Sequence, residues 1–434
     1  MTTLKAVRAT RDLLPPETVL WNRIEETARR VFARYNFGEI RTPIFEDTFL
    51  FARSVGEETD IVSKEMYTWE DRARAQSEKT QSLTLRPENT AGVVRAYIEH
   101  KLGETGQLQK LYYIGPQFRR ERPQKGRYRQ FFQIGAEVIG PPSSGSESPL
   151  RDAEVLEMLA TLLDELGITG WTLHLNSVGS AADRARYNEA LRAALVPVAP
   201  RMCADCQRRA VTNPLRVLDC KVPEDQPIIE SLPRIADSLD QDSVFHFAAV
   251  TAALDAAGVP YTRNHRLVRG LDYYTRTTFE FTHGGLGAQN ALLGGGRYDG
   301  LSEAIGGPKA PGIGFALGLD RLVLTLQAQE GNPDSAAQQA MDAYIAPLGE
   351  TVNAAALALA RELRRGGLSV ELGDGSFRIK KSFEAANRTA RRIVILGEDE
   401  LQSGILTVKD FSTGIQTKVP RAELAALLAR PAGE

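Results

Sequence analysis

The stretch YIGPQFRRERPQKGRYRQFFQIGAEVIG, from Tyr113 to Gly140, contains two apolar runs separated by a strongly basic segment. Both runs are rich in the aromatic and β-branched residues that favour strands. Two such runs on either side of a polar connector are the pattern of antiparallel strands joined by a loop. We therefore predict a pair of antiparallel strands between Gln109 and Gly140, with a long basic loop between them.

The connector RRERPQKGRYR, from Arg119 to Arg129, holds six basic residues and one acidic residue. A charge run is usually a solvated surface, so a hairpin tip in water is one interpretation. The other is phosphate binding, because guanidinium groups match phosphate oxygens in bidentate geometry and stay protonated. The connector by itself leaves both interpretations open.

Upstream, residues 17–35 place apolar side chains at helical spacing, which predicts an amphipathic helix that ends before Gly38. The segment GEIRTPIFED follows and predicts one short strand at a sheet edge or interface, where Pro43 is tolerated without an N–H.

The first residues, MTTLKAVRATRDLLPPE, lack an apolar run and do not indicate a signal peptide. No run of about 18 apolar residues predicts a transmembrane helix.

Downstream, Asp152 to Leu166 is helical in pattern, and WTLHLNSVG and TTFEFTH are typical of strands. Residues 180–258 carry several helical patterns and predict a helical insertion within a larger domain. PGIGFALGLDRLVLTL predicts a strand that runs directly into a helix. Small polar residues at 327–339 indicate an interdomain linker, and the alternating strand and helix patterns after it predict a small α/β domain with a partly parallel sheet.

The composition fits a globular protein of two or three domains, with 434 residues, 42% apolar and 25% charged. Lys and Arg number 53 against 55 Asp and Glu, so a nucleic-acid partner would meet local basic surfaces. Cys203, Cys206 and Cys220 are too few for a disulfide scaffold and favour a reducing compartment, the cytoplasm. A closed zinc site needs four ligands and no nearby histidine supplies the fourth, so we predict no metal site.

Two further motifs carry polar and glycine residues next to strand patterns. RGLDYYTRTTFEF, from Arg269 to Phe281, fits a plain strand end or a ligand site, since tyrosine is common where sheets meet water. GGGRYDG, from Gly294 to Gly300, allows a backbone to approach a ligand closely, but also occurs in ordinary turns. Walker, dinucleotide-binding, Ser/His/Asp and H-E-x-x-H patterns are absent from the sequence, which disfavours those chemistries.

The chain resembles the class II aminoacyl-tRNA synthetases in three segments that occur in the expected order. These are GEIRTPIFED, YIGPQFRRERPQKGRYRQFFQIGAEVIG and GIGFALGLDRL. LRPENTAGVVRAY, RGLDYYTRTTFEF and LLGGGRYDGL resemble segments peculiar to the histidyl-tRNA synthetases of bacterial type. The resemblance extends from ATRDLLPPE to KKSFEAANRTARRIVILGEDE in the final domain.

The resemblance implies an α+β fold with an antiparallel six-stranded catalytic sheet flanked by helices. It places a catalytic domain at 1–328, a helical insertion at 180–258 and an anticodon-binding α/β domain at 340–434. The implied reaction is ATP-dependent activation of L-histidine to histidyl-adenylate, followed by transfer to the 3′-terminal adenosine of tRNA(His). ATP, Mg²⁺, a homodimer and a cytoplasmic location, without a membrane partner, are implied with it.

Residue roles follow from the resemblance at matching positions. Arg119 would hold the α-phosphate of ATP, Arg127 the β- and γ-phosphates, and Arg321 the nucleotide from the opposite side. Arg269, with Arg119 the expected catalytic pair, would lie beside the α-phosphate and the histidine carboxylate. The expected histidine-binding residues are Glu88, Thr90, Gln133, Glu137, Arg269, Tyr273, Tyr274 and Tyr298. Asn89 and Phe132 depart from the glycine and histidine that the family often has there.

Three alternatives stay open at this point. A synthetase-like regulatory subunit of ATP phosphoribosyltransferase would share the fold, but its members usually lack the catalytic motifs and the final domain. A class II synthetase for another amino acid is a second alternative. For the final domain alone, a generic α/β module that aids dimer packing is the alternative to anticodon contact.

Overall fold

The computed structural model describes residues 3–56, 59–71, 80–121, 126–271, 273–286, 290–330 and 341–430. The chain divides into two compact units, Met1–Asn332 and Pro333–Glu434, which are described separately below. The predicted borders at 328 and 340 differ from this division by a few residues and stay predictions. Within the described residues, no helix is both long enough and apolar enough to cross a membrane.

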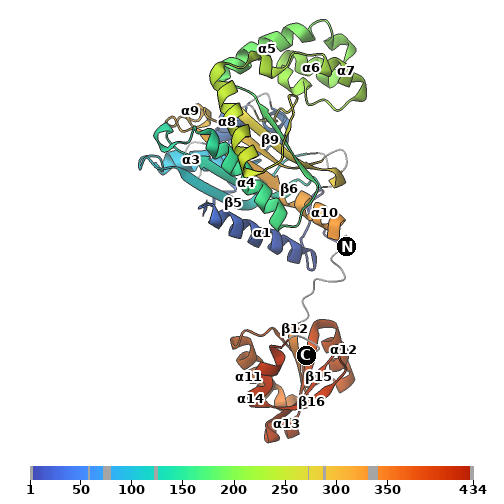
Figure 1. The fold of residues 1–434 in the computed structure, drawn as a ribbon. Helices are drawn as coiled ribbons and strands as arrows, with labels where there is room; N and C mark the ends of the chain where they lie inside the picture. Colours follow the sequence, from blue (N-terminus) through green and yellow to red (C-terminus); the bar gives the residue numbers. More distant parts are fainter. Residues whose placement is uncertain are drawn as a thin grey trace. The chain divides into compact units, whose positions relative to one another are not determined.

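A sheet of eight strands forms the centre of the first unit (Figure 1). Its inner strands, in spatial order, are β5 (Gln109–Phe118), β6 (Gln130–Ile139), β11 (Gly312–Gly318), β10 (Ala291–Arg297), β9 (Thr275–His283) and β7 (Trp171–Ser177). All neighbours among these six strands are antiparallel. The predicted six-stranded antiparallel sheet is therefore confirmed, and two-residue parallel strands, β1 (Gly38–Glu39) and β8 (Thr262–Arg263), extend its edges.

Four long helices cover one face of this sheet and form the main core with it. They are α1 (Glu17–Arg34), α4 (Pro149–Glu165), α8 (Gln241–Ala257) and α10 (Leu319–Glu330). Strand alternation directs the apolar side chains of β6, namely Ile134, Ala136 and Val138, into that core. The alternate residues of the strand, such as Gln133 and Glu137, consequently face the other side of the sheet, where the candidate site lies.

Smaller elements surround the other face of the sheet. They are the three-stranded sheet of β2 (Phe45–Asp47), β4 (Gln81–Leu85) and β3 (Tyr67–Asp71), with helices α2 (Thr48–Val55), α3 (Thr90–Glu99) and α9 (Leu301–Ala304). Short 3-10 turns of the chain lie at Pro142–Ser144, Ala199–Arg201, Pro214–Val217, Pro223–Asp225, Ile235–Ser238, Gly284–Leu286 and Glu350–Val352, with a π-helical turn at Ile61–Glu65. The start of α3 is the important part, since it enters the candidate site.

The chain between β7 and β8 is helical, with α5 (Ala181–Leu195), α6 (Ala204–Thr212) and α7 (Gln226–Glu230) gathered around a core of their own (Figure 1). Helix α8, which ends this segment, instead packs on α4 and contributes to the main core. The predicted insertion at 180–258 thus contains one helix that belongs to the layer covering the sheet.

The segment GEIRTPIFED differs from its prediction as a single strand. It forms two short strands in different sheets, β1 and β2, and Pro43 lies between them. The reason is Arg86, whose Nη1 donates to the carbonyl oxygens of Thr42 at 3.0 Å and Pro43 at 3.3 Å. Those carbonyls are bound to a buried guanidinium and not to a neighbouring strand.

The second unit is a five-stranded sheet with helices. The strand order is β13 (Val370–Leu372), β12 (Met341–Pro347), β14 (Ala390–Leu396), β15 (Ile405–Asp410) and β16 (Gln416–Pro420). Its helices are α11 (Asn353–Arg365), α12 (Ile379–Thr389), α13 (Glu398–Ser403) and α14 (Arg421–Leu428). Strands β13, β12 and β14 are parallel to one another, β15 is antiparallel to β14, and β16 is antiparallel to β15. The predicted partly parallel sheet is therefore confirmed. Residues 327–330 of the predicted linker belong to α10, and 331–339 lie outside the described residues.

Candidate active site

One cavity on the open face of the large sheet collects almost all the predicted site residues. The residues that line it include Glu88, Thr90, Arg119, Arg127, Gln133, Arg269, Tyr273, Tyr274, Tyr298 and Arg321. They come from segments spread over more than half of the chain, and the sheet brings them together. The cavity has a polar end made of acids and hydroxyls and a cationic end made of arginines.

Glu137 lies directly behind the wall of the polar end, fully buried on β6. Its two carboxylate oxygens accept separate hydrogen bonds, from Thr90 Oγ1 at 2.8 Å and from Tyr298 Oη at 2.7 Å. Burial raises the pKa of Glu137 to about 8, although these hydrogen bonds act in the opposite direction. A carboxyl with this pKa is mostly protonated at pH 7 until a positively charged group arrives.

A glycine on the neighbouring strand makes room for this carboxyl. Gly314 on β11 lies directly across from Glu137 in the strand pairing. A side chain at Gly314 would overlap Glu137 Oε2. The sequence GIGFALG of β11 thus alternates large core residues with small residues on the cavity side, as a strand with one packed face and one ligand face requires.

Glu88 is the second buried acid of the polar end, with 4% of its surface exposed. Its carboxylate accepts the N–H groups of Thr90 at 2.7 Å and Ala91 at 3.0 Å, which are the first free amides of α3. Burial raises the pKa of Glu88, and these amides limit the rise. Glu88 therefore fixes the start of α3 and keeps the Thr90 hydroxyl beside Glu137.

Gln133 and three tyrosines complete the polar end. Gln133 Oε1 is buried and has no hydrogen-bond partner among the described residues. A buried acceptor without a partner costs free energy, so an N–H group from a ligand fits this position. The rings of Tyr273 and Tyr274 have centroids 4.8 Å apart, and Tyr273 meets the Tyr298 ring edge-on at 6.0 Å. These rings form an apolar wall beside the polar groups.

At the cationic end, Arg119 and Arg127 share one acid, Glu121. Arg127 Nη1 lies 2.9 Å and Arg119 Nη1 lies 3.7 Å from Glu121 carboxylate oxygens. Arg119 is held further by the Pro87 carbonyl at 2.8 Å from its Nε and lies over the Phe131 ring. Two guanidinium groups on one carboxylate are placed to accept a larger anion in bidentate fashion.

Arg269 enters the cavity between the two ends. Its Nη1 lies 2.6 Å from Glu280 Oε1 on β9, and its Nε is buried without a hydrogen-bond partner among the described residues. The guanidinium passes over Gly294 on β10, where a Cβ would lie 2.5 Å from Arg269 Nη1. The glycine cluster therefore allows this arginine to lie flat on the sheet.

Arg321, at the start of α10, approaches the cationic end from the strand β11 side. Its Nη1 donates to the Ala291 carbonyl at 2.6 Å. Burial lowers the pKa of Arg321, and the positive charges of Arg127 and Arg269 lower it further. Cations close enough to repel one another in a cavity make a site for a polyanion.

The structure thus brings together the predicted residues, with Glu137 directly behind the cavity wall. Arg122, Lys125 and Asp272, which belong to the quoted motifs, lie outside the described residues. The two departures from the family pattern do not line the cavity: Phe132 packs edge-on against Trp21 at 5.4 Å, and Asn89 accepts a hydrogen bond from Thr42 at 2.6 Å.

Sequence reasoning missed two acids that position the arginines. Glu121 is the one acid of the basic connector, and Glu280 belongs to a predicted strand. Glu280 has a signal in the sequence, because it stands alone between Phe279 and Phe281 in FEF and so faces away from the core. An acid on the open face of a strand was a candidate partner for a nearby arginine.

The arrangement can hold a polyphosphate at the arginines and a small molecule with several N–H groups at the acids. Arg269 lies where these two ligands would meet. Among the described residues of the cavity no serine or cysteine offers a nucleophile. Chemistry here would rest on positioning and on charge stabilisation.

Comparisons with known proteins point in the same direction. A family model described as histidyl-tRNA synthetase matches residues 9–322, and one described as an anticodon binding domain matches residues 342–430. A histidine–tRNA ligase of Koribacter versatilis (strain Ellin345) is 73% identical over 423 residues, or 97% of this chain and 95% of that protein. A histidine–tRNA ligase of Solibacter usitatus (strain Ellin6076) is 56% identical over 98% of this chain and 99% of that protein. The crystal structure of apo S. aureus histidyl-tRNA synthetase has a TM-score of 0.80 and 38% identity, covering 99% of this chain and 100% of that one.

Proposed function

Since the chain belongs to the histidyl-tRNA synthetase family and is a histidine–tRNA ligase, we propose that its cavity binds ATP and L-histidine together and joins them as histidyl-adenylate. The single observation that carries this proposal is the presence of both ends in one cavity. The arginines provide a polyphosphate site, and the buried acids provide a site for a small cation with several N–H groups. Arg269 connects the two.

ATP occupies the cationic end in this proposal. Arg119 binds the α-phosphate, Arg127 the β- and γ-phosphates, and Arg321 holds the nucleotide from the opposite side. The ion pairs of Arg119 and Arg127 with Glu121 support this, because they keep both guanidinium groups extended toward the same space. A phosphate that replaces part of the contact to Glu121 gains bidentate hydrogen bonds without a large rearrangement.

Histidine occupies the polar end. Glu137, Glu88 and Gln133 offer acceptors to the ammonium and imidazole N–H groups, with Thr90 and the three tyrosines around them. The unpartnered Gln133 Oε1 and the raised pKa of Glu137 support this, since both groups gain a partner when a cationic ligand binds. A site built on buried hydrogen bonds rejects amino acids that lack them by about 10⁴-fold or more.

In the activation step, a histidine carboxylate oxygen attacks the α-phosphorus and pyrophosphate leaves in line. Arg119 and Arg269 stabilise the negative charge that grows on the α-phosphoryl oxygens. In the transfer step the 3′-hydroxyl of the terminal ribose attacks the mixed anhydride and adenosine monophosphate leaves. No covalent intermediate with the protein is needed.

Mg²⁺ is proposed to enter with ATP. The carboxylate of Glu280 lines the cavity beside the phosphate site and is a hard oxygen ligand of the kind that Mg²⁺ accepts. When bound, the ion neutralises phosphate charge, which assists the departure of pyrophosphate. The protein's own residues position both substrates.

A homodimer is proposed from the class II resemblance and from an exposed apolar surface. Four large apolar residues on or beside β2, α2 and β3 are 40–69% exposed: Ile44, Phe45, Phe49 and Trp69. Such a cluster on a protein surface marks an interaction site. We expect a dimer mass in light scattering and a monomer mass for the double variant Phe45→Glu, Phe49→Glu; an unchanged dimer would place the interface elsewhere.

The cytoplasm is the proposed location, where ATP and tRNA are found.

The test of the proposed function is charging of tRNA. The full chain is incubated with ATP, Mg²⁺ and a tRNA(His) transcript, and each amino acid is offered in turn. Acylation with histidine alone is expected. The anticodon-binding domain would contact the tRNA, and histidine would be transferred to the tRNA at the cavity. Folded protein that binds histidine but charges no tRNA would favour the regulatory subunit of ATP phosphoribosyltransferase, whose fold is shared.

A further inference from the structure

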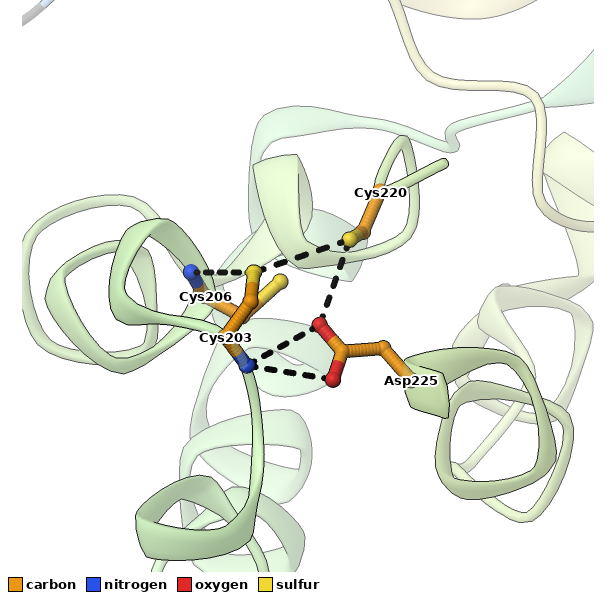
Figure 2. A group of neighbouring side chains, drawn as sticks. All are labelled: Cys203, Cys206, Cys220 and Asp225. Carbon is orange, nitrogen blue, oxygen red and sulfur yellow. Dashed lines mark hydrogen bonds between the residues drawn. The ribbon is translucent and has the colours of Figure 1, made fainter. Parts of the chain in front are cut away.

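The helical insertion contains a cluster of side chains that the reaction does not use. Cys203, Cys206, Cys220 and Asp225 each direct one sulfur or oxygen atom toward a common centre (Figure 2). These ligand atoms all lie within 4.8 Å of one another. Cys206, Cys220 and Asp225 are buried, and Cys203 is partly exposed. We propose that this cluster is a structural site for one Zn²⁺ ion, bound by three thiolates and one carboxylate.

The separations fit tetrahedral coordination. Zinc–sulfur bonds of about 2.3 Å and zinc–oxygen bonds of about 2.0 Å place two sulfurs about 3.8 Å apart and sulfur and oxygen about 3.5 Å apart. Cys203 Sγ lies 3.9 Å from Cys220 Sγ, and Cys220 Sγ lies 3.3 Å from Asp225 Oδ2. A disulfide would need the two sulfurs at about 2.05 Å. The cluster therefore has the size of a metal site.

The local structure places the ligands in three short segments. Cys203 precedes α6 and Cys206 lies in its first turn, so the C-x-x-C spacing brings both sulfurs to one side of the helix start. Cys220 follows the turn Pro214–Val217, and Asp225 ends the turn Pro223–Asp225 just before α7. One ion would tie these segments together at the centre of the insertion's core, to which Cys206 and Cys220 belong.

Backbone amides orient the ligands as second-shell groups do in zinc sites. The N–H of Cys206 lies 3.5 Å from Cys203 Sγ, and the N–H of Val222 lies 3.4 Å from Cys220 Sγ. The N–H of Cys203 donates to both oxygens of Asp225, at 3.1 and 3.2 Å. Donors directed at sulfur and carboxylate stabilise negative charge on them, which is the form that binds a metal.

Plain packing explains the thiols but not the acid. Buried cysteines often act as small apolar residues. Asp225, however, is 1% exposed, and its partners among the described residues are the Cys203 N–H and the Cys220 thiol, with no ion pair to a Lys, Arg or His. A buried carboxylate without a cation is costly, and a bound divalent ion removes that cost. This aspartate would supply the fourth ligand in place of a histidine.

The first experiment uses the reduced full-length chain, because the cluster contains all its cysteines. Zinc analysis is expected to give one ion per chain after dialysis, and X-ray absorption is expected to show three sulfur neighbours and one oxygen neighbour. Replacement by Co²⁺ is expected to give thiolate charge-transfer and tetrahedral d–d bands. Protein with three free thiols that retains neither zinc nor cobalt would overturn the proposal.

A matched pair of variants tests the aspartate without relying on cysteine changes that could prevent folding. Asp225→Asn keeps the shape and one acceptor for the Cys203 amide, and we expect zinc affinity, measured by competition with a chromophoric chelator, to fall at least about tenfold. Asp205→Asn, in the first turn of α6 beside Cys206 but exposed and paired with Arg208, is expected to bind zinc as the unchanged chain does. Equal affinity in both variants, with no oxygen neighbour in the absorption spectrum, would contradict the four-ligand site.

Discussion

The two ends of the cavity handle buried charge in opposite ways. At the polar end, the carboxyl group of Glu137 is satisfied by hydroxyl donors and made neutral by burial, with a pKa of about 8. At the cationic end, arginine charge cannot be removed in this way, and the guanidinium groups of Arg127 and Arg269 are instead held by the carboxylates of Glu121 and Glu280. In the proposed function, one end would bind its ligand by releasing a proton, and the other by exchanging one anion for another.

The largest expected effect is at the junction of the two ends. We expect Arg269→Ala to slow adenylate formation by about 10²- to 10³-fold, since it removes a donor to charge that develops only in the transition state. ATP binding should weaken far less, because the other arginines remain. Rapid-quench measurement of adenylate formation and equilibrium binding of ATP separate these two effects.

The matched control for that variant is Arg266→Ala. Arg266 lies three residues earlier and also pairs with an acid, Glu230, but it does not line the cavity. The rate of adenylate formation by Arg266→Ala should stay close to that of the unchanged chain. Equal losses in ATP affinity and in rate for Arg269→Ala would contradict the role assigned to this residue.

An intermediate effect is expected at the polar end. Glu137→Gln removes a charge-assisted hydrogen bond of about 1.5–3 kcal/mol, so histidine affinity should fall roughly 10- to 100-fold. With a pKa of about 8, Glu137 is protonated at pH 7 and must release its proton to bind a cationic ligand. Histidine affinity should therefore rise as pH increases from 7 toward 8 and level off above it.

Calorimetry in buffers of different ionisation enthalpy measures this proton release directly. The difference between the unchanged chain and Glu137→Gln isolates the protein group, because the substrate titrates identically in both. Glu165→Gln, on the exposed side of α4, is the control. It should release as many protons on histidine binding as the unchanged chain does. Proton release that persists in Glu137→Gln would show that another group titrates.

The smallest effect should come from the acid shared by Arg119 and Arg127. Partly exposed ion pairs contribute about 0.2–1 kcal/mol, so Glu121→Gln should change ATP affinity by no more than about fivefold. The direction is informative: affinity should increase, because the carboxylate competes with phosphate for the same guanidinium groups. Glu154→Gln, which also pairs with two cations but on α4, should leave ATP affinity unchanged. A decrease for Glu121→Gln would mean that Glu121 acts mainly by positioning.

The sequence predicted the helices, the strands and the residues of the cavity better than it predicted which side chains pair with one another. Periodicity placed α1, α4 and the strands around the basic connector, because one face of each packs on a core. The resemblance predicted the arginines, acids and tyrosines that the cavity brings together. The Arg269–Glu280 pair was not predictable in the same way, because it depends on the register of β9 against β10 and on the space left by Gly294.

The same limit explains one wrong prediction and one residue that the sequence analysis did not include. GEIRTPIFED was expected to be one strand, but the buried Arg86 binds the carbonyls that such a strand would have used. Asp225 was not among the candidate metal ligands, because it comes near the cysteines in the folded chain through a turn that spacing alone does not reveal. Both cases depend on one polar side chain meeting a distant segment.

The most direct test of the central claim is histidine-dependent exchange of pyrophosphate into ATP, measured without tRNA and with the other amino acids as controls. The claim is that one cavity joins ATP to histidine, so exchange is expected with histidine alone. Exchange with a different amino acid, or none in folded protein supplied with Mg²⁺, would contradict the assignment of the polar end.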